Sequence, residues 1–190
     1  MGLIKLVTDI QLGLETKKMR KPKTRYAARG IVIDDNNKVA LFYKAKKNEY
    51  KLPGEEIKDG SKEETFMLAA LNETGCDIDI VYDMGTIEEW KTHENFKQIS
   101  YVYIGKVVKN RHELKLSKED KKAGSVVVWV TINEAIKLIS KCYNELKETD
   151  SDSIYSIKFM VIRDLEILKY YKKNKKIINV EKKKFFSLFS

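Results

Sequence analysis

Short segments in which apolar residues alternate with polar ones, or run together, predict a sheet. These segments are rich in the β-branched and aromatic residues that strands favour. The predicted strands are Arg25–Ile33, Val39–Tyr43, Asp77–Tyr82, Thr86–Trp90, Phe96–Val108 and Ser125–Thr131. Turn-forming residues at 34–37 separate the first two segments, so we expect these two to pair as a hairpin.

The segment Lys62–Asn72 predicts a helix between the strands. Ser61 precedes it as a capping residue, and Glu64 three residues later completes a capping-box pattern. Gly75 is the expected C-terminal stop, because glycine adopts the left-handed conformation that ends many helices. The face expected to pack on the core consists of Met67, Ala70, Leu71 and Thr74.

Two later amphipathic segments, Ile132–Leu146 and Ile154–Tyr171, predict further helices. Strands come first, one helix interrupts them, more strands follow, and helices end the domain. This order predicts an α/β protein of the α+β type, with a mixed sheet sandwiched between helices. We expect residues 1–24 to form a basic, partly strand segment, 25–171 the folded domain, and 172–190 a flexible lysine-rich tail.

The net charge of +9 lies at the two ends of the chain. Residues 1–30 carry eight Lys and Arg against two acids, and residues 172–190 carry seven Lys against one Glu, so each end contributes +6 and the remainder −3. A basic arm can hold phosphates without reading sequence. A basic-armed binder of nucleic acid or membrane is therefore one hypothesis, but charge at a terminus is weak functional evidence, and we expect no specific nucleic-acid partner.

The sequence predicts neither secretion nor membrane insertion. The apolar run at residues 1–7 is too short for a signal-peptide core, and no stretch approaches the length of a transmembrane segment. Cys76 and Cys142 lie far apart, without the spacing of a zinc site or a disulfide framework. The cytoplasm is therefore the expected location.

A segment from Leu52 to Cys76 carries the clearest motif, LPGEEIKDGSKEETFMLAALNETGC. It resembles the Nudix box, a signature of hydrolases of nucleoside diphosphates linked to another moiety. The box opens and closes with glycines, and placing the closing one on Gly75 puts the opening one on Gly54 without a gap. The preceding hairpin and the following strands and helices are also similar to the family, so the resemblance covers residues 25–171 and implies the Nudix fold.

The resemblance also implies a reaction. A Nudix hydrolase cleaves a diphosphate with a water activated beside bound Mg²⁺, a cation that prefers oxygen ligands. Its helix supplies three glutamates at positions i, i+3 and i+4, which lie on one face. An arginine before them pairs with a glutamate of the preceding loop and holds this loop against the helix.

Both members of that arginine–glutamate pair are replaced in this chain. The arginine position holds Leu68, and the loop glutamate falls on Gly60, or on Ser61 if the loop is slipped by one residue. Removing one partner of a buried ion pair costs about 3–5 kcal/mol, whereas removing both leaves a consistent apolar packing. We therefore expect a settled, non-catalytic helix in which Leu68 contributes to packing.

Of the three helix glutamates, only the last remains. The three positions hold Ala69, Asn72 and Glu73. Glu73 is the candidate catalytic residue, and Glu73 together with the amide oxygen of Asn72 is the candidate metal site. A neutral amide binds Mg²⁺ more weakly than a carboxylate does, so the expected cofactor is Mg²⁺ if the protein is active and none otherwise.

Gly54, Glu55 and Glu56 precede the helix and are the candidate substrate-binding residues. Two carboxylates at this point would repel a phosphate group unless a metal were present. Glu119 and Asp120, before the last predicted strand, are candidates for a further acid. For these four acids, the alternative is solvated surface charge.

The sequence thus predicts a Nudix-domain protein whose hydrolysis is weak or lost, with a nucleoside diphosphate derivative or a related small molecule as ligand. One alternative is an active pyrophosphohydrolase that uses Glu73 and substitute acids. A second is a nucleotide-binding or protein-scaffolding pseudoenzyme. Whether the chain is an enzyme and whether it forms a homodimer both stay open at this stage.

Overall fold

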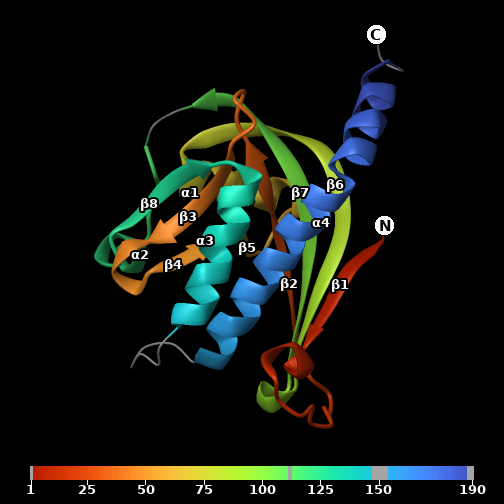
Figure 1. The fold of residues 1–190 in the computed structure, drawn as a ribbon, viewed down its shortest axis with the longest axis vertical. Coiled ribbons are helices and arrows are strands. Elements are labelled where there is room, and N and C mark those ends of the chain that lie inside the picture. Colours follow the sequence, from red (N-terminus) through yellow and green to blue (C-terminus); the bar gives the residue numbers. More distant parts are fainter. Residues whose placement is uncertain (1, 111–112, 147–153, 188–190) are drawn as a thin grey trace.

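The computed structural model describes residues 2–110, 113–146 and 154–187, and within them an eight-stranded mixed sheet carries helices on both faces (Figure 1). The strands are β1 (Leu3–Thr8), β2 (Lys23–Ile33), β3 (Val39–Lys44), β4 (Glu49–Lys51), β5 (Gly54–Glu56), β6 (Cys76–Lys91), β7 (Phe96–Asn110) and β8 (Ser125–Val130). The helices are α1 (Lys62–Thr74), α2 (Lys118–Lys122), α3 (Ile132–Glu145) and α4 (Ile154–Ser187). Short 3₁₀ turns occur at Asp9–Leu12, Ala45–Lys47 and Thr92–Glu94.

The sheet is built around β2, with strand order β1-β6-β7-β2-β3-β4. β2 runs parallel to β7 and antiparallel to β3 and β5, while β8 pairs with β3. The predicted hairpin is confirmed, with Ile33 opposite Val39. The two strands predicted between residues 77 and 90 are one long strand, β6, which is interrupted by register shifts and pairs along its length with β7.

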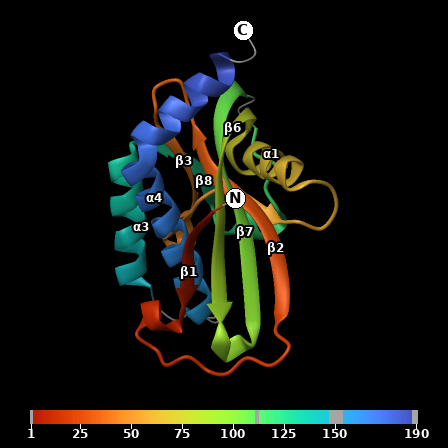
Figure 2. The ribbon, with the colours of Figure 1, turned by 90° about the vertical axis from the view of Figure 1, so that its right-hand side faces the viewer.

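Helices cover both faces of the sheet, so the predicted sandwich is confirmed. Figure 2 shows α3 and α4 on one face and α1 on the other. Side chains of β2 alternate between two cores. Ile31 and Ile33 join the cluster under α3 and α4, whereas Ala28 and Val32 join the smaller cluster under α1.

Helix α1 begins and ends as predicted but turns a different face to the core. Ser61 accepts a hydrogen bond from the Glu64 amide, and Gly75 ends the helix in the left-handed conformation. The predicted core face is wrong at Met67, which is 37% exposed, while Phe66 is fully buried. Residues 66–71 are all apolar, so periodicity alone does not select the buried side.

Strand β5 lies directly before the loop that leads into α1. Its three residues pair with β2, with Gly54 opposite Arg29. A Cβ on Gly54 would lie 2.3 Å from the Arg29 Cβ, so the absence of a side chain lets the two strands approach. The loop is thereby tied to the centre of the sheet.

Both ends of the chain extend the domain. β1 adds a parallel strand to β6, and α4 runs past the predicted helix end at Tyr171 to Ser187, with Ile178 buried. The boundaries proposed at residues 24 and 171 stay predictions, and Leu188 to Ser190 lie outside the described residues. None of the helices in the described part of the chain has the length and apolarity needed to cross a bilayer.

A buried carboxylate fastens the N-terminal segment to the rest of the protein. Asp9 is fully buried and accepts hydrogen bonds from the hydroxyls of Thr92 and Tyr155, both at 2.5 Å, and from the Thr92 amide at 3.2 Å. His93 Nε2 lies 3.8 Å from the same carboxylate. Burial raises the pKa of Asp9, but the hydrogen bonds from Thr92 and Tyr155 outweigh this effect and hold the pKa below its ordinary value of 3.8.

We expect this contact to make stability depend on acidity. Because the folded pKa of Asp9 is lowered, its contribution is complete above the ordinary value and is lost as the pH falls through the folded value. The difference in unfolding free energy between wild type and Asp9→Asn should therefore be constant from about pH 5 to pH 7 and shrink below about pH 4. Urea denaturation at each pH measures it, and a constant difference down to pH 2 would contradict the assignment.

Candidate functional site

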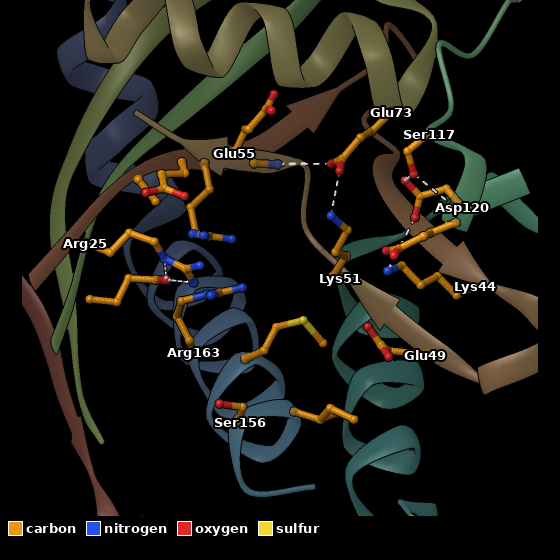
Figure 3. Close-up of a pocket in the computed structure, with 18 of the residues that line it drawn as sticks. Arg25, Lys44, Glu49, Lys51, Glu55, Glu73, Ser117, Asp120, Ser156 and Arg163 are labelled. Carbon is orange, nitrogen blue, oxygen red and sulfur yellow. Dashed lines mark hydrogen bonds and ion pairs between the residues drawn. The ribbon is translucent and has the colours of Figure 1, made fainter. Parts of the chain in front are cut away.

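A cavity of about 770 Å³ lies between the sheet and the surrounding helices. Strands β2 to β7 contribute to its lining, as do the end of α1, the stretch from Lys115 to Asp120, and the first turns of α4. Figure 3 shows charged side chains from these elements pointing into one space. Each predicted site residue lines this cavity: Gly54, Glu55, Glu56, Asn72 and Glu73, together with the acids Glu119 and Asp120.

Glu73 is held by two contacts at the end of α1. Its Oε1 lies 2.5 Å from Lys51 Nζ, and its Oε2 accepts a hydrogen bond of 3.1 Å from the Gly54 amide. Figure 3 shows Lys51 reaching toward Glu73 from β4. The Lys51 ammonium also lies 5.1 Å from the centre of the Phe42 ring, which supports its position. Both oxygens of the remaining box glutamate are thus occupied by protein donors.

Leu68 and Ala69, two of the three positions before Glu73 that differ from the motif, have different surroundings. Ala69 is 1% exposed and belongs to the packed side of α1. Leu68 is 52% exposed, so the expectation that it contributes to packing is wrong. Phe66 and Ala70 pack on the sheet in place of Leu68. Helix α1 therefore packs on the sheet through an aromatic residue and small residues, and Leu68, which stands at the arginine position of the motif, faces solvent.

The substitute acids are spread over the cavity. Glu55 and Glu56 are exposed on β5. Asp120 accepts a hydrogen bond of 2.6 Å from the Ser117 hydroxyl and lies 3.4 Å from Lys44 Nζ. Burial raises the pKa of Asp120, but Ser117 and Lys44 together lower it below its ordinary value. Asp120 is thus an ionised, already paired carboxylate.

These residues do not fit the Mg²⁺ site that a Nudix box implies. Among the described residues, no three acids, histidines or cysteines come close enough to hold one ion. Glu73 faces the ammonium of Lys51. A cation so close would repel a divalent ion, and the neutral Asn72 adds no compensating charge. The described part of the chain therefore has no group of carboxylates comparable with the three that the motif requires.

The sequence analysis missed a cationic wall on the α4 side of the cavity. It is formed by Arg25 and Arg29 of β2, Lys91 of β6 and Arg163 of α4. Strand alternation explains its position. Arg25 and Arg29 share the face of β2 that continues as Ile31 into the core under α4. Glu89 and Lys91 likewise follow Ile87 on β6.

The two buried arginines of this wall are in different electrostatic situations. Arg163 lies 3.2 Å from Glu89 and 2.8 Å from Asp164. Burial lowers its pKa, but these two carboxylates more than offset this and raise it. Burial also lowers the pKa of Arg29, and the charge of Arg163 lowers it further, to about 10. Arg29 nevertheless stays protonated at neutral pH.

The fold is similar to known structures. A MutT protein from Methanosarcina mazei Go1 is 15% identical over 82% of this chain and 99% of its own, with a TM-score of 0.50. The chain has the Nudix fold. A Nudix hydrolase from Nitrosomonas europaea is 17% identical over 68% of this chain and 100% of its own, with a TM-score of 0.49. No family model matches the sequence, and no curated protein is similar to it.

Within this Nudix fold, the box segment runs from β5 through α1 to the start of β6. Its opening glycine pairs with β2 and its closing glycine ends α1. The frame of the motif is therefore kept by backbone requirements at Gly54 and Gly75, independently of the acids between them.

Proposed function

We propose that this Nudix-fold protein binds a nucleoside diphosphate derivative, or a related small molecule, and that its hydrolytic activity is weak or lost. The observation that carries the proposal is the state of Glu73. Its carboxylate is bonded to Lys51 and to the Gly54 amide. A glutamate engaged in this way is poorly available either to hold Mg²⁺ or to activate a water.

The cavity itself supports retained binding. Its volume of about 770 Å³ falls within the range of small-molecule sites. It is lined by charged groups of both signs, including the four cations of the wall. These suit a ligand that carries phosphate. The cytoplasmic location remains a prediction from the sequence, and whether the chain forms a homodimer stays open.

The alternative of an active pyrophosphohydrolase draws on the acids of the cavity. Glu55, Glu56 and Glu119 are exposed and line the same space as Glu73. Such an enzyme would use Mg²⁺ as its cofactor, and it would need Lys51 to leave Glu73 when the ion binds. The non-hydrolytic form needs no cofactor.

Turnover measurements separate the two. We expect wild type and Glu73→Gln to hydrolyse a panel of nucleoside diphosphate derivatives with Mg²⁺ at the same near-background rate. Asp79→Asn, at an exposed acid outside the cavity, is the matched control. An ordinary turnover number of about 1–1000 s⁻¹ that Glu73→Gln abolishes and Asp79→Asn preserves would overturn the proposal. Calorimetry with the same panel in EDTA should show binding by the wild type.

A further inference from the structure

Three cations of the wall are hydrogen-bonded only to neutral groups among the described residues. Arg29 Nε donates to the Ser100 hydroxyl at 3.0 Å, and Lys91 Nζ donates to the Ser156 hydroxyl at 3.0 Å. Arg25 donates to the Gln98 side-chain oxygen, with its Nε at 2.8 Å. Each of these side chains lines the cavity. Positive charge therefore accumulates on this side without direct carboxylate partners.

Two acids whose charge acts on Arg29, Glu89 and Asp164, are bound by Arg163. Glu89 Oε2 accepts from Arg163 and from Gln98. Asp164 accepts from Arg163 through Oδ1 and from the Leu52 amide through Oδ2, at 2.9 Å. The pKa of Arg163 is raised and that of Arg29 is lowered, which agrees with direct carboxylate contacts at Arg163 and none at Arg29 among the described residues. Arg163 is paired directly with two carboxylates, whereas Arg29 feels the charge of Asp164, Glu89 and Glu73 without being hydrogen-bonded to any of them among the described residues.

Arg29 is the most constrained of the three cations. It is 5% exposed, and one of its five N–H donors has an acceptor among the described residues. A buried guanidinium in this state is stabilised strongly by an anion that can accept two parallel hydrogen bonds. Phosphate offers that geometry, and the planar fork of arginine matches it better than lysine does.

We propose that Arg29, assisted by Arg25 and Lys91, forms an oxyanion subsite that holds the phosphoryl group of the cavity ligand without a divalent cation. This inference rests on the proposed function, because it names the part of the ligand that the cavity recognises. In this arrangement, protein cations neutralise the phosphate charge that Mg²⁺ neutralises in Nudix hydrolases.

An acceptor beside the subsite adds a second requirement. Glu89 is fully buried and lines the cavity, and its Oε1 has no hydrogen-bond partner among the described residues. A buried carboxylate oxygen without a partner is costly, and a hydroxyl or amino group of a ligand would satisfy it. The ligand class that fits both features is a phosphate ester with a hydrogen-bond donor close to the phosphoryl group, as in a nucleotide.

Calorimetry in EDTA with ADP and with inorganic pyrophosphate tests the subsite. We expect wild type to bind ADP more tightly than pyrophosphate, and Arg29→Met to weaken both at least tenfold. Arg29→Lys keeps the positive charge but loses the two parallel N–H donors of the guanidinium. Its affinity for both probes should lie between those of wild type and Arg29→Met. Lys106→Met removes an exposed cation outside the cavity and should leave both affinities unchanged.

The outcomes separate the subsite from the proposed function. Tight binding that survives Arg29→Met overturns the subsite and leaves the proposed function standing. Binding of pyrophosphate alone, lost in Arg29→Met, supports the subsite and overturns the nucleoside part of the function. If wild type binds neither ADP nor pyrophosphate, both the subsite and the proposed function are overturned. Thermal unfolding without ligand distinguishes a structural role from a binding role. If Arg29 acts in binding, Arg29→Met should melt no lower than wild type. A variant that melts lower or fails to fold would show that Arg29 is structural and would contradict the subsite.

Discussion

Ala69→Glu, which restores the first glutamate of the box, is expected to destabilise the protein by about 3–5 kcal/mol, the cost of a buried charge without a partner. Ala69 is 1% exposed on the packed side of α1. The added carboxylate would lose its hydration and would also overfill the interface between helix and sheet. Urea denaturation followed by circular dichroism measures the change in the free energy of unfolding.

Leu68→Arg is the matched control, because it restores the neighbouring position of the same motif. Leu68 is 52% exposed, so the arginine would extend into solvent and change the free energy of unfolding by no more than about 0.5 kcal/mol. Equal costs for the two substitutions would contradict the orientation of α1. A rise in the melting temperature of Ala69→Glu on addition of Mg²⁺ would show that the introduced carboxylate and Glu73 can together hold an ion, against the conclusion drawn from Lys51.

Gly30→Ala should lower the free energy of unfolding by an amount comparable with that of Ala69→Glu, because its added Cβ would collide with the backbone of the sheet. A Cβ at Gly30 would lie 2.0 Å from the Tyr103 carbonyl oxygen and 2.8 Å from Phe66 Cζ. Overpacking costs about 1–3 kcal/mol where side chains can shift. Here the obstacle is the backbone of β7, which is paired with β2 at this position. We expect a loss above that range, measured as the change in denaturation midpoint and slope.

Gly2→Ala provides the control for this prediction, because nothing lies within 4 Å of a Cβ added there. It should unfold like wild type. A Gly30→Ala variant of wild-type stability would mean that β2 and β7 are further apart than the structure places them. Because Gly30 follows Arg29 directly, a partly folded variant should also lose ADP binding.

Strands β2, β3, β7 and β8, the capped helix α1 and the spacing between Gly54 and Gly75 could be predicted from sequence, whereas β4 and β5 could not, and β6 was predicted as two strands. Each of the predicted elements depends on residues near one another in the chain, such as Ser61 with Glu64, or the alternation along residues 25–33. The buried face of α1 could not, because six apolar residues in succession offer no periodicity. The side of α1 that becomes buried is determined by its packing against the sheet, through Phe66 and Ala70.

Some residues of the candidate site could be predicted from the sequence and others could not. The positions of Gly54 and Glu73 in the cavity follow from the motif. The partner of Glu73 does not, because Lys51 comes from a short strand 22 residues earlier and is one of many lysines. The cationic wall joins strands β2 and β6 to α4, and no local pattern indicates that Arg29 and Lys91 share a cavity. The available signal was Arg29, which stands in a run of β2 that is otherwise apolar apart from Gly30, whereas Lys91 follows two glutamates in β6 and gives no such signal.

The buried contact of Asp9 has a consequence for the order in which the chain folds during synthesis. β1 pairs with β6, from Leu3 opposite Thr86 to Thr8 opposite Trp90, and Asp9 takes its last hydrogen bond from Tyr155. β1 is therefore synthesised some eighty residues before its partner strand, and Asp9 is synthesised 146 residues before Tyr155. Contacts of such long range form slowly. We expect β1, although synthesised before β6 and α4, to dock late, and its apolar residues to stay exposed until then.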